Sequence, residues 1–86
     1  MITKSIEIKL PRGLEARPVA EIVQTASQFQ SAIYLISGTK KINAKSIMGM
    51  MSLGLGAGEK VTVVTDGNDE QTAMDEIEKY LSQGQE

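Results

Sequence analysis

The segment RPVAEIVQTASQFQSAIYLIS, residues 17–37, contains two hydrophobic periods in succession. After Pro18 its apolar residues recur at helical spacing, which predicts an amphipathic helix from about Arg17 to Gln28. The β-branched and aromatic run from Ala32 to Ser37 then predicts a strand. Such a helix and such a strand bury their apolar sides best against each other, so this segment favours a sheet with helices packed on it.

Further strands are predicted on both sides of this segment. Apolar and polar residues alternate over Ser5–Leu10 and over Val61–Thr65, as in strands with one buried face. The polar turn after Ser37 leads into Lys41–Asn43, so these residues are expected to form a hairpin with the strand before it.

Two more helices are expected later in the chain. Ser46 stands at the N-cap position of a short helix, which must end near Gly54 because glycines are costly inside helices. We interpret the glycine-rich run that follows as a connection, since it lacks the order and spacing of a phosphate-binding loop. A last helix, capped by Asn68 or Asp69, has an acidic outer face. Its apolar stripe consists of Ala73, Met74, Ile77 and Leu81.

The predicted element order is β-α-β-β-α-β-α, which indicates an α+β fold with helices on one face of a sheet. With 86 residues, the chain has room for one small core, so residues 1–86 are expected to form one domain. The tail, residues 82–86, is expected to be disordered.

The composition excludes several kinds of chemistry. The chain has no Cys and no His, which removes disulfides, thiolate nucleophiles, imidazole catalysis and the commonest metal ligands. We therefore expect no enzyme activity, no metal and no cofactor. The net charge of −2 argues against direct nucleic-acid binding. No apolar run is long enough for a membrane span or a secretion signal, so a cytoplasmic location is expected.

The short helix after Ser46 carries the first candidate binding surface. If Met50 and Leu53 face the sheet, then Ile47, Met48 and Met51 point to solvent, as an adaptable apolar patch for a partner. The alternative is that a small domain buries the whole helix and uses its methionines as core residues.

Charged and hydroxyl side chains at two helix starts have alternative interpretations as well. Ser46 is either an ordinary N-cap or a phosphorylation site, where a phosphate would meet free N–H groups with Lys45 adjacent. Glu15 and Arg17 precede the first long helix, and they form either solvated surface charges or a place where an anion or acidic partner binds.

Two motifs stand at Gly13–Pro18 (GLEARP) and at Lys40–Leu53 (KKINAKSIMGMMSL). The first is similar to the glycine-aliphatic-histidine-small-arginine-proline motif of the HPr family, the phosphocarriers of the bacterial sugar phosphotransferase system. The second resembles the regulatory serine motif of that family. The resemblance covers essentially the whole chain and implies an HPr-like open-faced β-sandwich, a four-stranded antiparallel sheet with three helices on one face.

The chain departs from the carrier motif at one position. Glu15 stands where HPr has its phosphate-carrying histidine, and a carboxylate would have to form a different and more labile acyl phosphate. The resemblance is therefore to the catabolite-repression HPr-like branch, which implies a corepressor rather than a sugar phosphocarrier. The alternatives are a phosphoryl carrier that uses Glu15 and a plain interaction domain. Glu15 itself is either a neutral relic or an imitation of a phosphorylated carrier residue.

The resemblance also implies partners and site residues. HPr kinase/phosphorylase would phosphorylate Ser46, and a CcpA-type transcription regulator would bind the product. The implied partner-binding residues are Glu15, Arg17, Ala20, Lys45, Ser46, Ile47, Met48 and Met51. The sequence is compatible with a homo-oligomer.

Overall fold

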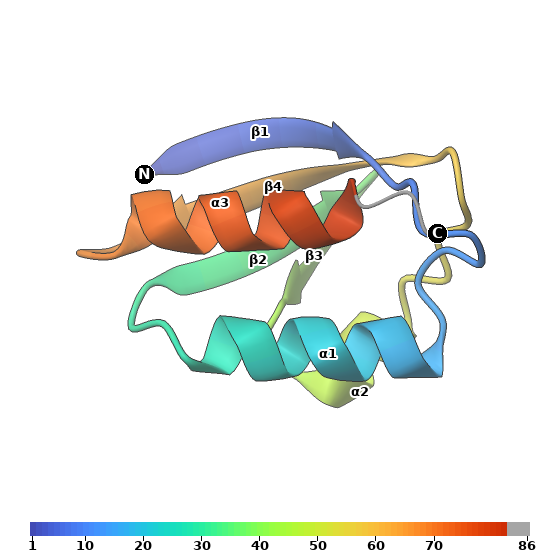
Figure 1. Cartoon of the computed structure of the whole chain (residues 1–86), viewed down its shortest axis with the longest axis horizontal. Coiled ribbons are helices and arrows are strands. Elements are labelled where there is room, and N and C mark those ends of the chain that lie inside the picture. Colours follow the sequence, from blue (N-terminus) through green and yellow to red (C-terminus); the bar gives the residue numbers. More distant parts are fainter. Residues whose placement is uncertain (83–86) are drawn as a thin grey trace.

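The computed structural model describes residues 1–82, so most of the tail for which disorder was expected lies outside the described residues. Strands and helices follow in the predicted order (Figure 1). Their bounds are β1 (Ile2–Glu7), α1 (Ala16–Ser27), β2 (Ala32–Ser37), β3 (Lys40–Asn43), α2 (Ile47–Met51), β4 (Lys60–Asp66) and α3 (Glu70–Leu81).

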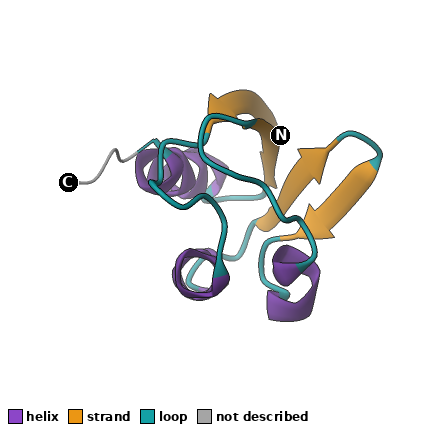
Figure 2. Ribbon diagram, turned by 90° about the vertical axis from the view of Figure 1, so that its right-hand side faces the viewer, coloured by secondary structure: helices purple, strands orange, loops and turns teal. Residues whose placement is uncertain are grey.

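The strands form one antiparallel sheet in the order β1-β4-β2-β3. β4 lies between β1 and β2, and the register places Val63 opposite both Lys4 and Leu35. All three helices lie on the same side of this sheet, and the other face is open (Figure 2). The predicted α+β class, with helices on one face of a four-stranded antiparallel sheet, is confirmed.

The core lies between the sheet and the helices. β2 and β4 send alternate side chains into it, as the period of two requires. β1 adds Ile6 and β3 the half-buried Ile42, and the amphipathic faces of α1 and α3 close the core from the other side. Burying each aliphatic side chain fully stabilises the folded state by about 1.5–3 kcal/mol relative to leaving it exposed. The most deeply buried residues are Ile8, Val19, Ile22, Ala26, Ile33, Leu35, Ala44, Met50, Val63, Thr65, Ala73, Met74, Ile77 and Leu81. The expected stripe of the last helix is thus confirmed.

The first strand begins and ends earlier than predicted. The alternation indicated Ser5–Leu10, whereas β1 pairs from Ile2 to Glu7. Glu7 faces Lys60, the first residue of β4, and only Ile8 extends the pairing, donating to the carbonyl of Glu59 at 2.8 Å and accepting the Gly58 N–H at 2.7 Å. The chain leaves the sheet there, and the Lys9 N–H donates to the carbonyl of Leu81 at 2.8 Å. The apolar alternation continued past the strand because Leu10 is still buried.

The hairpin between β2 and β3 is confirmed, with Ser37 paired to Lys40 across a two-residue loop. Gly38 has φ +60° in the first loop position, which a type II′ turn requires and which a residue with a Cβ rarely adopts. This turn fixes the register that brings β3 beside α2.

The last helix does not have the predicted side-chain cap. Asp69 occupies the N-cap position but makes no cap hydrogen bond. Its carboxylate instead accepts the Gln30 N–H at 2.9 Å, the Ser31 N–H at 2.9 Å and the Ser31 hydroxyl. Asp69 therefore links the start of α3 to the loop before β2. Because these segments are far apart in the sequence, this role is visible only in the folded structure.

Candidate functional site

Ser46 caps α2, as predicted. Its backbone is extended, and its Oγ accepts the Gly49 N–H at 3.3 Å. Gly49 brings the helix close to β3, since a Cβ at this position would lie 3.0 Å from Cγ2 of Ile42. Ser46 is itself exposed, so the serine hydroxyl combines a capping role with access from solvent.

The residues after Ser46 form an exposed apolar surface, which we call the α2 patch: Ile47, Met48 and Met51. Their exposed fractions are 46%, 80% and 50%, whereas Met50 is 0% exposed and Leu53 is also buried. A helix of five residues can turn only one side inward. The expectation that these three residues face solvent is confirmed, and the alternative that the whole helix is buried is wrong.

Lys45 precedes Ser46, but its side chain is already engaged. Its ammonium donates to the carbonyl of Phe29 at 2.7 Å, just beyond the end of α1. Its N–H donates to Oδ1 of Asn43 at 2.8 Å. Lys45 therefore connects the C-terminal end of α1 to the beginning of α2, and its ammonium would have to leave Phe29 to meet a phosphate on the serine.

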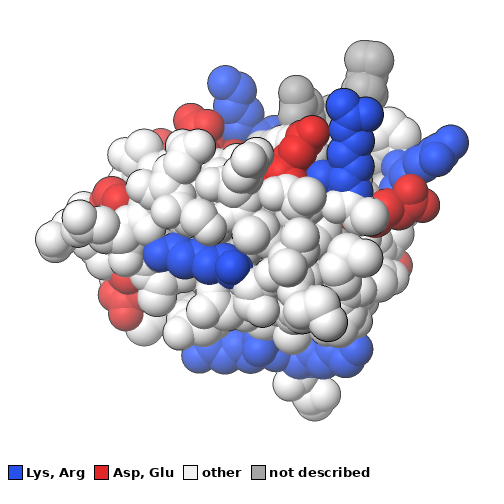
Figure 3. Space-filling model, turned by 90° about the horizontal axis from the view of Figure 1, so that it is seen from below, with Lys and Arg blue, Asp and Glu red and all other residues white. Residues whose placement is uncertain are grey.

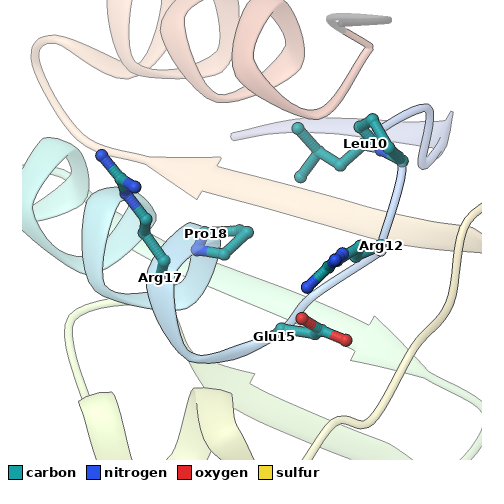
Figure 4. Close-up of a pocket in the computed structure, with 6 residues that line it drawn as sticks. Leu10, Arg12, Glu15, Arg17 and Pro18 are labelled. Carbon is teal, nitrogen blue, oxygen red and sulfur yellow. The ribbon is translucent and has the colours of Figure 1, made fainter.

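The first motif, Gly13–Pro18, lines part of a hollow of about 360 Å³ at the start of α1 (Figure 4). Glu15 is the N-cap residue, but its side chain makes no cap hydrogen bond. Arg17 extends away from Glu15 in Figure 4, and its Nε lies 3.7 Å from Oε2 of Glu21. The hollow is lined by Leu10, Pro11, Arg12, Glu15, Arg17 and Pro18.

The two motifs are held on neighbouring helices. The Leu14 N–H donates to the carbonyl of Leu55 at 2.8 Å, so the loop before α1 is fixed to the loop after α2. Gly13 is needed there, because its φ is +68° and a Cβ would lie 2.5 Å from the oxygen of Leu55. α1 packs beside α2 in both ribbon views, and the exposed Ala20 lies on α1 (Figures 1 and 2).

The surface that contains α1 and α2 has a mixed character. Seen from below, it is largely uncharged, and both basic and acidic side chains lie at intervals on it (Figure 3). Within residues 1–82 there is no group of three or more side chains that could hold a metal ion. None of the helices in this part of the chain is long and apolar enough to cross a membrane.

One further contact involves residues that the sequence did not single out. The Tyr80 hydroxyl donates to Oε1 of Glu21 at 2.6 Å, while the other oxygen of Glu21 faces Arg17. Burial, followed by the Glu21 hydrogen bond, raises the pKa of Tyr80 to about 12. The two residues are 59 positions apart, so no local pattern could have shown that Arg17 is linked to α3.

Comparison with known proteins shows the family. The family model described as the PTS HPr component phosphorylation site matches residues 2–83. The chain belongs to the HPr family. It is 49% identical over 81 residues to the HPr-like protein Crh of Halalkalibacterium halodurans, with 94% of this chain and 96% of that protein covered.

Solved HPr-family structures have the same fold. HPr-C-His from Thermoanaerobacter tengcongensis gives a TM-score of 0.94 at 45% identity, covering 100% of this chain and 99% of that one. Crh of Bacillus subtilis, described as a dimer with a swapping domain, gives 0.78 at 43% identity, covering 98% and 97%. These similarities, and the absence of histidine, support an HPr-family regulatory protein of the catabolite-repression type.

Proposed function

We propose that HPr kinase/phosphorylase phosphorylates this protein on Ser46 and that the phosphorylated form is a corepressor for a CcpA-type transcription regulator. The observation that carries the proposal is the position of an exposed capping serine directly before the α2 patch. A modifying enzyme can reach the hydroxyl, and a regulator can contact charge and apolar surface together.

The phosphate would change charge more than shape. It adds about −2 charge and three acceptor oxygens. These oxygens would lie beside the first N–H groups of α2, which have no hydrogen-bond partner within the helix. Gly49 already donates to this position. Because α2 has five residues, its dipole is short, and the local N–H groups are the main stabilising contribution. The fold therefore needs little rearrangement.

Binding would combine two kinds of contact. The phosphate dianion forms charge-assisted hydrogen bonds with basic groups of the regulator, which are stronger than neutral ones. The α2 patch supplies apolar area, and methionine side chains adapt to the shape of a partner. Glu15, Arg17 and Ala20 are exposed at the start of the neighbouring helix, and we propose that they take part in the same contact.

The direct test is phosphate transfer from ATP by HPr kinase/phosphorylase, followed by intact mass. We expect one phosphate on the parent chain and none on Ser46→Ala. Ser52→Ala is the matched control, because Ser52 is also an exposed serine at the other end of the same helix, where its hydroxyl donates to the carbonyl of Gly49. Uptake by Ser46→Ala, or no uptake by the parent, would contradict the proposal.

The second test is binding of the regulator to the phosphorylated chain. We expect the Ser46-phosphorylated protein to bind and the unmodified protein to bind at least about tenfold more weakly, since a charged hydrogen bond contributes about 1.5–3 kcal/mol. Equal affinity of the two forms would exclude a phosphate-dependent corepressor.

Glu15 can be tested separately in the phosphorylated protein. If its charge imitates a phosphorylated carrier residue, Glu15→Gln changes the affinity for the regulator, and equal affinities identify Glu15 as a relic. Incubation with phosphoenolpyruvate and the upstream phosphotransferase component is expected to add no mass. An adduct that Glu15→Gln removes would show carrier activity instead.

A cytoplasmic location follows from the same proposal. The kinase uses ATP and the regulator binds DNA, so we place the protein in the cytoplasm.

A homodimer is a further proposal, because the Bacillus subtilis relative is described as a dimer. Size-exclusion chromatography with light scattering tests it, and a single monomeric mass across concentrations would contradict it.

A further inference from the structure

The methionines of this protein are either at least half exposed or fully buried. Met48 and Met51 are 80% and 50% exposed on the α2 patch, whereas Met50 and Met74 are 0% exposed in the core. Met1, at the start of β1, is also exposed. These are the five methionines of the chain, so two of the three exposed ones lie on the α2 patch.

We infer that Met48 and Met51 are a modification site at which hydroperoxides inactivate the α2 patch by forming methionine sulfoxide. The consequence for the regulator rests on the proposed function, but the site itself does not. Susceptibility of methionine to oxidation follows access of the oxidant to sulfur. Met48 and Met51 lie within one exposed helical turn close to Ser46, so they are the accessible methionines of the α2 patch, and Met1 is exposed elsewhere.

The reaction balances with hydrogen peroxide as the only co-reactant. A lone pair of the thioether sulfur attacks one peroxide oxygen, so that an S–O bond forms while the O–O bond breaks. The proton of the attacked oxygen goes to the departing hydroxide, which leaves as water. Sulfur loses two electrons and the peroxide gains them. Methionine sulfoxide reductases reverse the modification, with one enzyme for each sulfoxide epimer.

The modification would change the surface while leaving the fold intact. A sulfoxide is polar and chiral, and it finds hydrogen-bond partners in water at positions that are already exposed. In a complex, the same oxygen would be buried against an apolar partner surface without a hydrogen bond, which is costly. The cap bond from Gly49 to Ser46 involves neither sulfur, so the serine keeps its position.

The first experiment tests the site without any partner. The unphosphorylated chain is treated with hydrogen peroxide, and peptide mapping gives the oxidation rate of each methionine. We expect Met48 and Met51 to react at least about tenfold faster than Met50 and Met74, because exposure controls the rate. In urea all these rates should become similar. Equal rates in the folded protein would overturn the inference.

The second experiment tests the consequence. The Ser46-phosphorylated chain is oxidised, and its affinity for the CcpA-type regulator is measured before oxidation, after it, and after treatment with both reductases. We expect an affinity loss of about tenfold or more, recovered on reduction, since the buried sulfoxide lacks a partner. Unchanged affinity at complete oxidation of Met48 and Met51 would overturn the switch.

A double variant tests whether the two sulfur atoms of the α2 patch cause the effect. Met48→Leu with Met51→Leu conserves the volume and polarity of the patch but cannot form sulfoxide. It retains Met1, so persistent peroxide sensitivity in this variant would assign the effect elsewhere and contradict the inference. If the unoxidised phosphorylated chain fails to bind the regulator, the proposed function fails, while the rate measurement still decides the site.

Discussion

The ammonium of Lys45 donates a hydrogen bond of 2.7 Å to the main-chain carbonyl of Phe29. This contact joins the residue before the candidate phosphorylation site to the end of α1. Lys45 precedes Ser46, so the sequence indicates it as a partner for a phosphate on the serine. In the structure its side chain instead helps to position α2. The same contact has a measurable consequence for stability.

Replacing Lys45 with Met is expected to destabilise the protein by about 1–2 kcal/mol, because a partly buried carbonyl loses a charged donor. Urea denaturation measures this change in the free energy of unfolding. Lys60→Met is the control, since Lys60 is an exposed residue at the start of β4, and its effect is expected to stay within about 0.5 kcal/mol. Equal effects of the two variants would contradict the role of Lys45.

Met50 and Met51 are neighbours with opposite environments. Met50→Ala is expected to cost about 2–5 kcal/mol of unfolding free energy, since it leaves a cavity in the core. Met51→Ala should change the free energy by less than about 0.5 kcal/mol but weaken binding of the phosphorylated chain to the regulator. Urea denaturation and a binding titration measure the two effects. Unchanged affinity of Met51→Ala would refute the α2 patch as a contact surface.

The Asp69 contact predicts a dependence of stability on pH. The Ser31 hydroxyl, followed by the Gln30 N–H, holds the pKa of the Asp69 carboxyl below its ordinary value. Because the folded-state pKa is depressed, the contribution is complete above the unfolded pKa of about 3.9 and disappears as the pH falls through the folded-state pKa. Asp69→Ala should therefore destabilise the protein near neutral pH and progressively less below about pH 4.

Urea denaturation of the parent and of Asp69→Ala across that pH range measures the effect. Asp75→Ala serves as the control, because Asp75 is exposed and bonded only to the Gln71 side chain of the same helix among the described residues. A difference between the parent and Asp69→Ala that stays constant down to low pH would contradict a contribution from the ionised carboxylate.

The raised pKa of Tyr80 predicts that the stability of the protein also depends on pH in the alkaline range. Burial and the Glu21 carboxylate raise its pKa from 10.0 to about 12. A raised folded-state pKa favours the protonated phenol, so its contribution to stability is complete below the unfolded pKa and is lost as the pH rises toward 12. Ultraviolet absorbance of the phenolate in a Tyr34→Phe background isolates this group.

Glu21→Gln should then lower the pKa of Tyr80, though not below 10.0, because burial remains the larger cause. The same variant removes the carboxylate opposite Arg17. If Glu21→Gln left the titration of Tyr80 unchanged, the hydrogen bond between α1 and α3 would be contradicted.

Several features of the site were predictable because they are local. The N-cap at Ser46 and the outward direction of Met48 and Met51 depend on residues within one or two turns of helix. The turn at Gly38 depends on the conformation of a single residue. The motif around Glu15 could be read for the same reason, although its hollow also needs Leu10 from the preceding segment.

Other features could not be read from the sequence. The bounds of β1 depend on β4, because a regular ladder needs both strands, and Glu7 meets Lys60 only after the chain has folded back. The sequence predicts Asn68 or Asp69 as the cap of α3, but the Asp69 carboxylate accepts hydrogen bonds from Gln30 and Ser31 instead of capping the helix.

The sequence by itself determined the periods of the helices and strands, the capping serine and the missing carrier histidine, since each of these is a property of adjacent residues. Only the tertiary structure decided that Lys45 binds Phe29 and that Tyr80 binds Glu21. Such contacts join groups far apart in the chain, and their geometry is fixed by how the helices pack on the sheet rather than by any local preference.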